Sequence, residues 1–154
     1  MFKEGDITPE FTIKTDTNDF ELNLKNKKLT VVFFFPRANT SGCTKEAVEF
    51  SSLIEKFNNL NTRVIGVSKD TAEQQKKFRT KHNLKCELGS DYDGKICEMF
   101  SVWVEKSMYG KKYMGIQRST FLSNERGIIT NVWEKVKVPG HAEEVLETVK
   151  SLNN

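Results

Sequence analysis

Cysteine, proline and long apolar runs are all scarce in this sequence of 154 residues, which has three cysteines and three prolines. The cysteines, Cys43, Cys86 and Cys97, are too few and too odd in number for the disulfide framework of a small secreted protein. They include no C-x-x-C pair, which excludes a zinc ribbon and a thioredoxin-type dithiol site. No stretch reaches the about 18 consecutive apolar residues of a membrane-spanning helix. We therefore expect a cytoplasmic protein with free thiols.

A large excess of charge is also lacking, since 24 basic and 21 acidic residues give a net charge of +3. A dedicated nucleic-acid binder usually gathers basic residues on one face, so the lysine-rich runs at 24–28 and 75–82 are interpreted as solvated surface. Residues 1–11 contain charges and no apolar core, and we expect no secretory signal peptide there. With 11 phenylalanines and 37% hydrophobic residues, the chain is predicted to form one globular domain over residues 1–154.

The hydrophobic pattern alternates between the period of strands and that of helices. Residues 29–35 (LTVVFFF) form a continuous apolar run, which is typical of a strand covered on both faces. From Thr44 onward, apolar residues recur at helical spacing. The order of elements predicts an α/β fold with a mixed sheet flanked by helices and an N-terminal β-hairpin. Further strands are expected at 11–15, 20–24, 63–68, 86–91, 119–123 and 128–133, and further helices at 70–84 (with Asp70 or Thr71 as N-cap), 94–102 and 138–152.

Cys43 stands where the buried strand stops and the following helix begins. If that helix begins between Ser41 and Thr44, the thiol lies in its first turn, where backbone N–H groups lack intrahelical partners and the helix dipole is positive. Both features stabilise a thiolate, and cysteines at helix N-termini ionise more readily than the free side chain. A reactive thiol is therefore one interpretation of Cys43, and an inert, buried, small side chain is the other.

The loop before Cys43 contains residues that fit a reactive site. Pro36 ends the strand because it has no N–H donor. Thr40 precedes Cys43 by three residues and can bring its hydroxyl to the sulfur, and Gly42 leaves the backbone open to a ligand. Each also has a structural interpretation, since Thr40 or Ser41 can cap the helix and Gly42 can shape a turn.

The pattern Pro36-x-x-x-Thr40-x-x-Cys43, followed by TKEAVEF, resembles the active-site motif of the peroxiredoxins, and most closely that of the bacterioferritin-comigratory, or Q-type, group. The segments GDITPEFTI, VIGVSKD, CEMFSVWVEKSMYGKKYMGIQRSTFL and VPGHAEEVL are similar to that group in the same order, so the resemblance covers nearly the whole chain. It implies a thioredoxin-like fold and thiol-dependent reduction of hydrogen peroxide and organic hydroperoxides, with no metal, haem or flavin.

By position, the resemblance implies that Cys43 is the peroxidatic nucleophile, that Thr40 hydrogen-bonds the peroxide and that Pro36 shields the thiolate. It also implies that Arg118, in GIQRSTFL, stabilises the thiolate and the charge on the departing oxygen. A fixed cation suits this role, because cleavage of the O–O bond places negative charge on the leaving oxygen. From its sequence position alone, an ordinary ion pair at a sheet edge is the favoured interpretation of Arg118, and only the resemblance reverses it.

The chain departs from the family pattern at two positions. Ser41 replaces the usual proline, and we expect little effect from this change. Val48 occupies the position of the usual resolving cysteine, five residues after Cys43, so the usual intrahelical disulfide cannot form. The sulfenic acid on Cys43 must then be reduced by an external thiol, in a one-cysteine mechanism, or by Cys86 or Cys97. We favour the external thiol, because both remaining cysteines are expected to face the core.

Other functions compete with this one. A cysteine phosphatase is excluded, because it needs an arginine six residues after the cysteine, where Glu49 stands. A peroxide sensor or redox-regulated chaperone that signals through oxidised Cys43 is the alternative to an enzyme. Residues 102–115 are expected to form a loop near the site that admits organic hydroperoxides, packs locally or contacts another subunit. His82 and His141 are interpreted as structural. The implied partners are a peroxide and thioredoxin, glutaredoxin or a small thiol, with no nucleic acid and no membrane, and a monomer is expected.

Overall fold

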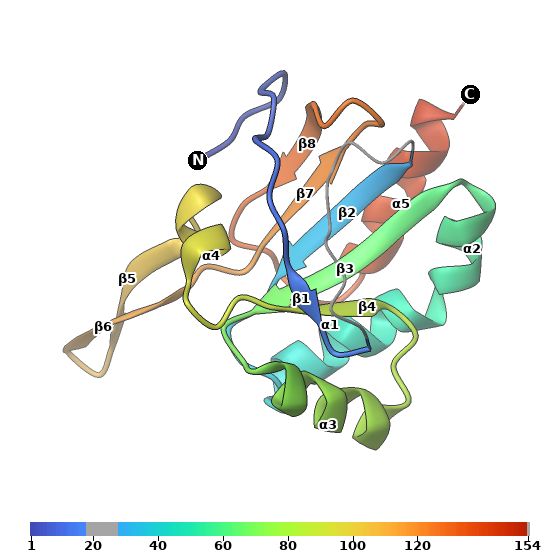
Figure 1. The fold of residues 1–154 in the computed structure, drawn as a ribbon. Coiled ribbons are helices and arrows are strands. Elements are labelled where there is room, and N and C mark those ends of the chain that lie inside the picture. The colour runs from blue at the N-terminus through green and yellow to red at the C-terminus, as the bar shows by residue number, and fades with distance from the viewer. Residues whose placement is uncertain (18–27, 154) are drawn as a thin grey trace.

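The computed structural model describes residues 1–17 and 28–153, and its main sheet confirms the predicted mixed arrangement. The strands are β1 (Lys14–Thr15), β2 (Leu29–Phe34), β3 (Thr62–Ser68), β4 (Glu87–Ser90), β7 (Ser119–Ser123) and β8 (Ile129–Trp133). Their order across the sheet is β1-β4-β3-β2-β7-β8 (Figure 1). The middle strands β4, β3 and β2 are parallel, whereas β1, β7 and β8 each run antiparallel to a neighbour.

Successive residues of β2 point to opposite faces of the sheet and so build two cores from one apolar run. Phe33 lies in the first core, where its ring stacks on Phe50 at a centroid distance of 4.4 Å. Phe34 lies in the second core, 5.1 Å from the ring of Phe100. The first core is covered by α1 (Ser41–Ser52), α2 (Ile54–Asn59), α3 (Ala72–His82) and α5 (His141–Leu152), and the second by α4 (Lys95–Met99).

The predicted helix after β2 and the predicted helix at 70–84 are both confirmed, with sharper bounds. The first begins at Ser41, so Cys43 lies in its opening turn, and it ends before Leu53, where α2 follows. The second has Thr71 as its N-cap: the Thr71 hydroxyl accepts from Gln74 N–H at 3.1 Å, and the Gln74 side chain accepts from Thr71 N–H at 2.8 Å. This reciprocal pair is a capping box, which satisfies two donors at the helix start.

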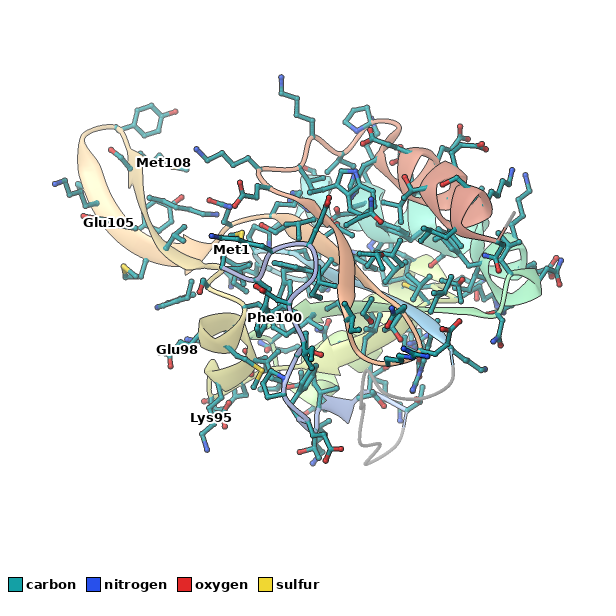
Figure 2. The ribbon with its side chains drawn as sticks, turned by 90° about the horizontal axis from the view of Figure 1, so that it is seen from above. Met1, Lys95, Glu98, Phe100, Glu105 and Met108 are labelled. Carbon is teal, nitrogen blue, oxygen red and sulfur yellow. The ribbon has the colours of Figure 1, made fainter. Side chains whose placement is uncertain are left out.

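The prediction of a loop at 102–115 is wrong. This segment forms a two-stranded hairpin of β5 (Trp103–Met108) and β6 (Lys111–Ile116), which projects from the body of the molecule (Figure 1) and carries Glu105 and Met108 (Figure 2). Its turn is Tyr109-Gly110, with φ values of 52° and 78°, as two-residue hairpin turns require. The pattern does not indicate strands here because most side chains of the hairpin are exposed, so no buried face imposes an alternation.

Of the expected N-terminal hairpin, the described residues include the first strand. Lys14 and Thr15 form β1 and pair with Ser90 and Gly89 of β4, whereas the expected second strand at 20–24 lies outside the described residues. Among the residues that the structure describes, no helix has the length and apolar character needed to cross a bilayer.

Gly66 of β3 lies opposite Phe33 in the ladder, and a Cβ on Gly66 would lie 2.5 Å from Phe33 Cζ. We expect Gly66→Ala to force the Phe33 ring against Phe50 and to lower the free energy of unfolding by about 1–3 kcal/mol. Denaturant unfolding measures the change, with Ser107→Ala on the exposed hairpin as the matched control. Equal stability of the Gly66→Ala variant and the wild type would contradict this packing.

Candidate active site

Cys43 lies in the first turn of α1, three residues after the N-cap Thr40, and is 1% exposed. Phe35 continues the ladder of β2 by donating its N–H to the Val67 carbonyl at 3.0 Å, so the chain leaves the sheet immediately before the site. The helix ladder opens with Thr44 N–H, which donates to the Thr40 carbonyl at 2.9 Å. The sulfur therefore lies at the positive end of the helix dipole, among the N–H groups that precede the ladder.

The loop between β2 and α1 is fixed by Asp70, at the junction of β3 and α3. Asp70 Oδ2 accepts hydrogen bonds from Ala38 N–H at 2.8 Å and from Ser68 Oγ at 2.5 Å. Asn39 follows with a φ of 64°, in the left-handed region that asparagine tolerates better than most residues. These contacts attach the start of α1 to the neighbouring parallel strand.

Arg118, immediately before β7, contacts the first turn of α1. Its Nη2 donates to Cys43 Sγ at 3.2 Å, and its Nη1 donates to Glu46 Oε1 at 2.6 Å. The Arg118 carbonyl accepts from Val136 N–H at 2.9 Å, which fixes the backbone. Burial opposes the charge of Arg118, but the acidic groups of Glu46 and Cys43 outweigh it and raise the pKa of Arg118. The guanidinium is therefore a permanent cation beside the sulfur.

Glu46 completes the cluster, one helical turn after Cys43 on the same face of α1. It is 1% exposed; its Oε1 accepts from Arg118, and its Oε2 has no hydrogen-bond partner among the described residues. Burial raises the pKa of the Glu46 carboxyl from 4.5 to about 7, against the lowering effect of Arg118. One guanidinium thus faces two buried acidic groups.

Thr40, Pro36 and Gly42 lie on the segment that leads to Cys43. Thr40 is exposed, and its hydroxyl donates to the Arg37 carbonyl at 2.8 Å instead of to the sulfur. Pro36 is exposed just after the end of the buried strand. A Cβ on Gly42 would lie 3.4 Å from Arg118 Nη2, so the bare Cα of the glycine faces the guanidinium. Of the predicted site residues, the structure therefore brings Cys43 and Arg118 into direct contact.

The sequence is similar to those of known proteins over most of its length. Residues 5–132 match the model of the AhpC/TSA family. The chain belongs to the AhpC/TSA family. It is 42% identical to the putative peroxiredoxin Bcp of Coxiella burnetii, over 92% of this chain and 95% of that protein. It is 41% identical to peroxiredoxin Bcp of Bacillus subtilis, over 97% of this chain and 96% of that protein. The solved structure of a cysteine-to-serine mutant of PrxQ from Xylella fastidiosa matches with a TM-score of 0.93 at 34% identity, over 100% of this chain and 99% of that one.

These likenesses confirm the predicted family, enzyme class and thioredoxin-like fold: the protein is a peroxiredoxin of the Bcp, or peroxiredoxin Q, group. Peroxiredoxins are thiol peroxidases, so its substrates are a peroxide and a thiol reductant. Within residues 1–17 and 28–153, no three His, Cys, Asp or Glu side chains gather in a group that could hold a metal ion.

The two other cysteines of this peroxiredoxin are buried away from the first turn of α1. Cys86 accepts a hydrogen bond from Ser51 Oγ at 3.5 Å, and Ser51 lies eight residues after Cys43, which is about 12 Å along a helix. Cys97 belongs to the core on the opposite face of the sheet. Burial raises the pKa of the Cys86 thiol to about 11, and burial together with Asp91 raises that of the Cys97 thiol.

Two charged residues near the site, Glu46 and Lys106, are not among the predicted site residues. The spacing of three from Cys43 was a usable signal for Glu46, because it places both side chains on one helix face. Lys106 is brought to the site by β5, where burial and the charge of Arg118 lower its pKa and Cys43 acts in the opposite direction. No local pattern marks Lys106, because its position depends on the hairpin.

His141 begins α5 and packs among buried groups beside the site, as the structural interpretation expects. It is 5% exposed, its ring lies 5.9 Å from Phe50 and 5.8 Å from Trp133, and its Nε2 is hydrogen-bonded to Thr120 Oγ1 at 2.8 Å. Burial lowers the pKa of His141 from 6.5 to about 4.

Between pH 6.5 and 4 the unfolded chain binds a proton at His141 that the folded chain does not, so acid lowers the free energy of unfolding. The full shift corresponds to about 3 kcal/mol. Glu46 acts in the opposite direction over part of this range, because folding raises its pKa to about 7. We therefore compare the wild type with His141→Gln by denaturant unfolding. The difference in the free energy of unfolding between the wild type and His141→Gln should be about 3 kcal/mol smaller near pH 4 than at neutral pH. A difference that does not change with pH would contradict the buried, neutral histidine.

Proposed function

We propose that this peroxiredoxin reduces peroxides through the thiolate of Cys43. The sulfur attacks the terminal peroxide oxygen, the S–O bond forms as the O–O bond breaks, and the leaving alkoxide or hydroxide takes up a proton to become an alcohol or water. The sulfur is oxidised to a sulfenic acid, and the peroxide is reduced. The 3.2 Å contact between Arg118 Nη2 and Cys43 Sγ carries this proposal, because it sets a permanent cation against a thiol in the first turn of a helix.

Arg118 is assigned to stabilise both the sulfur anion and the charge that develops on the leaving oxygen. Its largely buried position strengthens both interactions, since little water screens them. Thr40 is assigned to hydrogen-bond the peroxide, for which its hydroxyl must turn from the Arg37 carbonyl to the substrate. Pro36 is assigned to shield the thiolate from water.

The sulfenic acid is reduced by an external thiol, as in a one-cysteine enzyme. The position of the usual resolving cysteine is occupied by Val48, which is 42% exposed. A disulfide requires Cα atoms within about 7 Å of each other. Cys86 contacts α1 about two helical turns beyond Cys43, and Cys97 lies across the sheet, so α1 would have to unwind before either could bridge to Cys43.

Organic hydroperoxides are assigned as substrates together with hydrogen peroxide. The solved bacterioferritin comigratory protein of Xanthomonas campestris is described by its alkyl peroxide reduction activity, and it matches this chain with a TM-score of 0.87 at 32% identity, over 97% of this chain and 100% of that one. The hairpin that carries Lys106 also exposes Met108, Tyr109, Tyr113 and Met114, which offer apolar surface. Thioredoxin, glutaredoxin or a small thiol is assigned as the reductant of a monomeric, cytoplasmic enzyme.

Cys43→Ser should abolish peroxide consumption, and Arg118→Gln should lower the rate constant for hydrogen peroxide by about 100-fold or more, because it removes the cation beside the reacting atoms. Arg126→Gln, an exposed arginine in the turn between β7 and β8, is the matched control and should react at the wild-type rate. Steady-state consumption with a thiol reductant measures the rates. Wild-type turnover by Cys43→Ser would overturn the proposal, and a wild-type protein that stops after one equivalent of peroxide would be a sensor.

The one-cysteine assignment predicts that Cys86→Ser/Cys97→Ser keeps the turnover of the wild type with an external thiol. Intact mass after treatment with one equivalent of peroxide, without reductant, should show a gain of one oxygen atom. A loss of two hydrogen atoms from the wild type would instead reveal an internal disulfide, and its absence in one of the single serine variants would name the partner of Cys43.

A further inference from the structure

The cluster of Cys43, Glu46 and Arg118 contains one cation and two acidic groups. The guanidinium is divided between them, with Nη2 at 3.2 Å from Cys43 Sγ and Nη1 at 2.6 Å from Glu46 Oε1. Cys43 and Glu46 are each 1% exposed, so water cannot stabilise a second negative charge. The favoured state therefore has one anion for the one cation, and one of the two acidic groups carries a proton.

Glu46 Oε2 indicates which group carries that proton. Glu46 Oε2 has no partner in the part of the chain that the structure describes, and a buried oxygen without a partner costs less on a neutral carboxyl than on an ionised carboxylate. Burial raises the pKa of Glu46 to about 7; Arg118 opposes this shift and Glu49 adds to it. The sulfur, in contrast, lies among the backbone N–H groups of the first turn of α1, which favour its ionised form.

We infer that Glu46 holds a proton while Cys43 is a thiolate and releases it when peroxide consumes that thiolate. This inference rests on the proposed role of Cys43. With hydrogen peroxide, the sulfur forms the S–O bond, the O–O bond breaks and hydroxide leaves; the proton from Glu46 converts that hydroxide to water. The sulfenic acid is neutral, so the Glu46 carboxylate then becomes the counterion of Arg118. Before and after the reaction, the cluster contains one anion beside its one cation and has no net charge.

The charged and titratable groups around the cluster come from several elements. Lys106 of β5 lies near Arg118 and Cys43 and favours anions, whereas Glu49 of α1 disfavours ionisation of Glu46. His141 of α5, with a pKa of about 4, is neutral at neutral pH. Glu46 thus positions Arg118 by accepting a hydrogen bond from Nη1. It also supplies the proton that the leaving oxygen needs.

Counting protons in a single turnover tests this inference. Reduced wild-type protein is mixed with one equivalent of hydrogen peroxide at neutral pH in weak buffer with an indicator dye, while the ultraviolet absorbance of the thiolate reports the loss of ionised Cys43. The inference predicts well below one proton taken up from solvent per thiolate lost. Glu46→Gln keeps an acceptor for Arg118 Nη1 but has no carboxyl proton to release. This variant should therefore take up close to one proton from solvent per thiolate lost. Glu55→Gln, at an exposed glutamate of α2, is the matched control and should give the wild-type count.

Uptake close to one proton per thiolate in the wild type would overturn the inference and leave the chemistry of Cys43 intact. The wild-type count is decisive by itself, so the test holds even where Glu46→Gln folds poorly. A thiolate signal that persists after addition of peroxide would instead overturn the proposed function, as would oxidation of Cys43→Ser at the wild-type rate.

Discussion

The site depends on one guanidinium that is shared by two acidic side chains. Arg118 bonds Cys43 Sγ through Nη2 and Glu46 Oε1 through Nη1, with all three groups largely withdrawn from water. In such surroundings each charge interacts strongly with its neighbours, so the state of one acidic group constrains the other. In the proposed mechanism, the ionised sulfur, the protonation of the leaving oxygen and the proton on Glu46 all follow from this single arrangement.

The topology of the sheet makes this arrangement possible. β2 runs parallel to β3 and antiparallel to β7, so Phe34 at the end of β2 lies opposite both Val67 near the end of β3 and Ser119 at the start of β7. The loop that leaves β2 can therefore be held by Asp70, just beyond β3, while Arg118 reaches the same edge from the residue before β7. The ring of Phe50 in α1 stacks on that of Phe33 in β2, and this contact packs the helix against the sheet and fixes its direction.

The elements that bury apolar residues could be predicted from the sequence, because burial imposes a period on the chain. β2 is entirely buried and α1 buries one face, and both were predicted together with their junction at Cys43. The hairpin of β5 and β6 could not be predicted in this way, since most of its side chains are exposed and, among the described residues, its strands pair only with each other. The contact of Arg118 was implied by family resemblance alone, because it joins segments that are 75 residues apart. The position of Lys106 depended on the hairpin, and Glu46 could have been found from its spacing to Cys43.

An ultraviolet titration of the thiolate, taken as the difference between the wild type and Cys43→Ser, tests the central claim most directly. The two remaining thiols contribute equally to both proteins, and burial raises the pKa of each, so the difference reports Cys43 alone. The account predicts that Cys43 is largely ionised at neutral pH and that one equivalent of hydrogen peroxide removes the signal. A protonated Cys43 at neutral pH would contradict it.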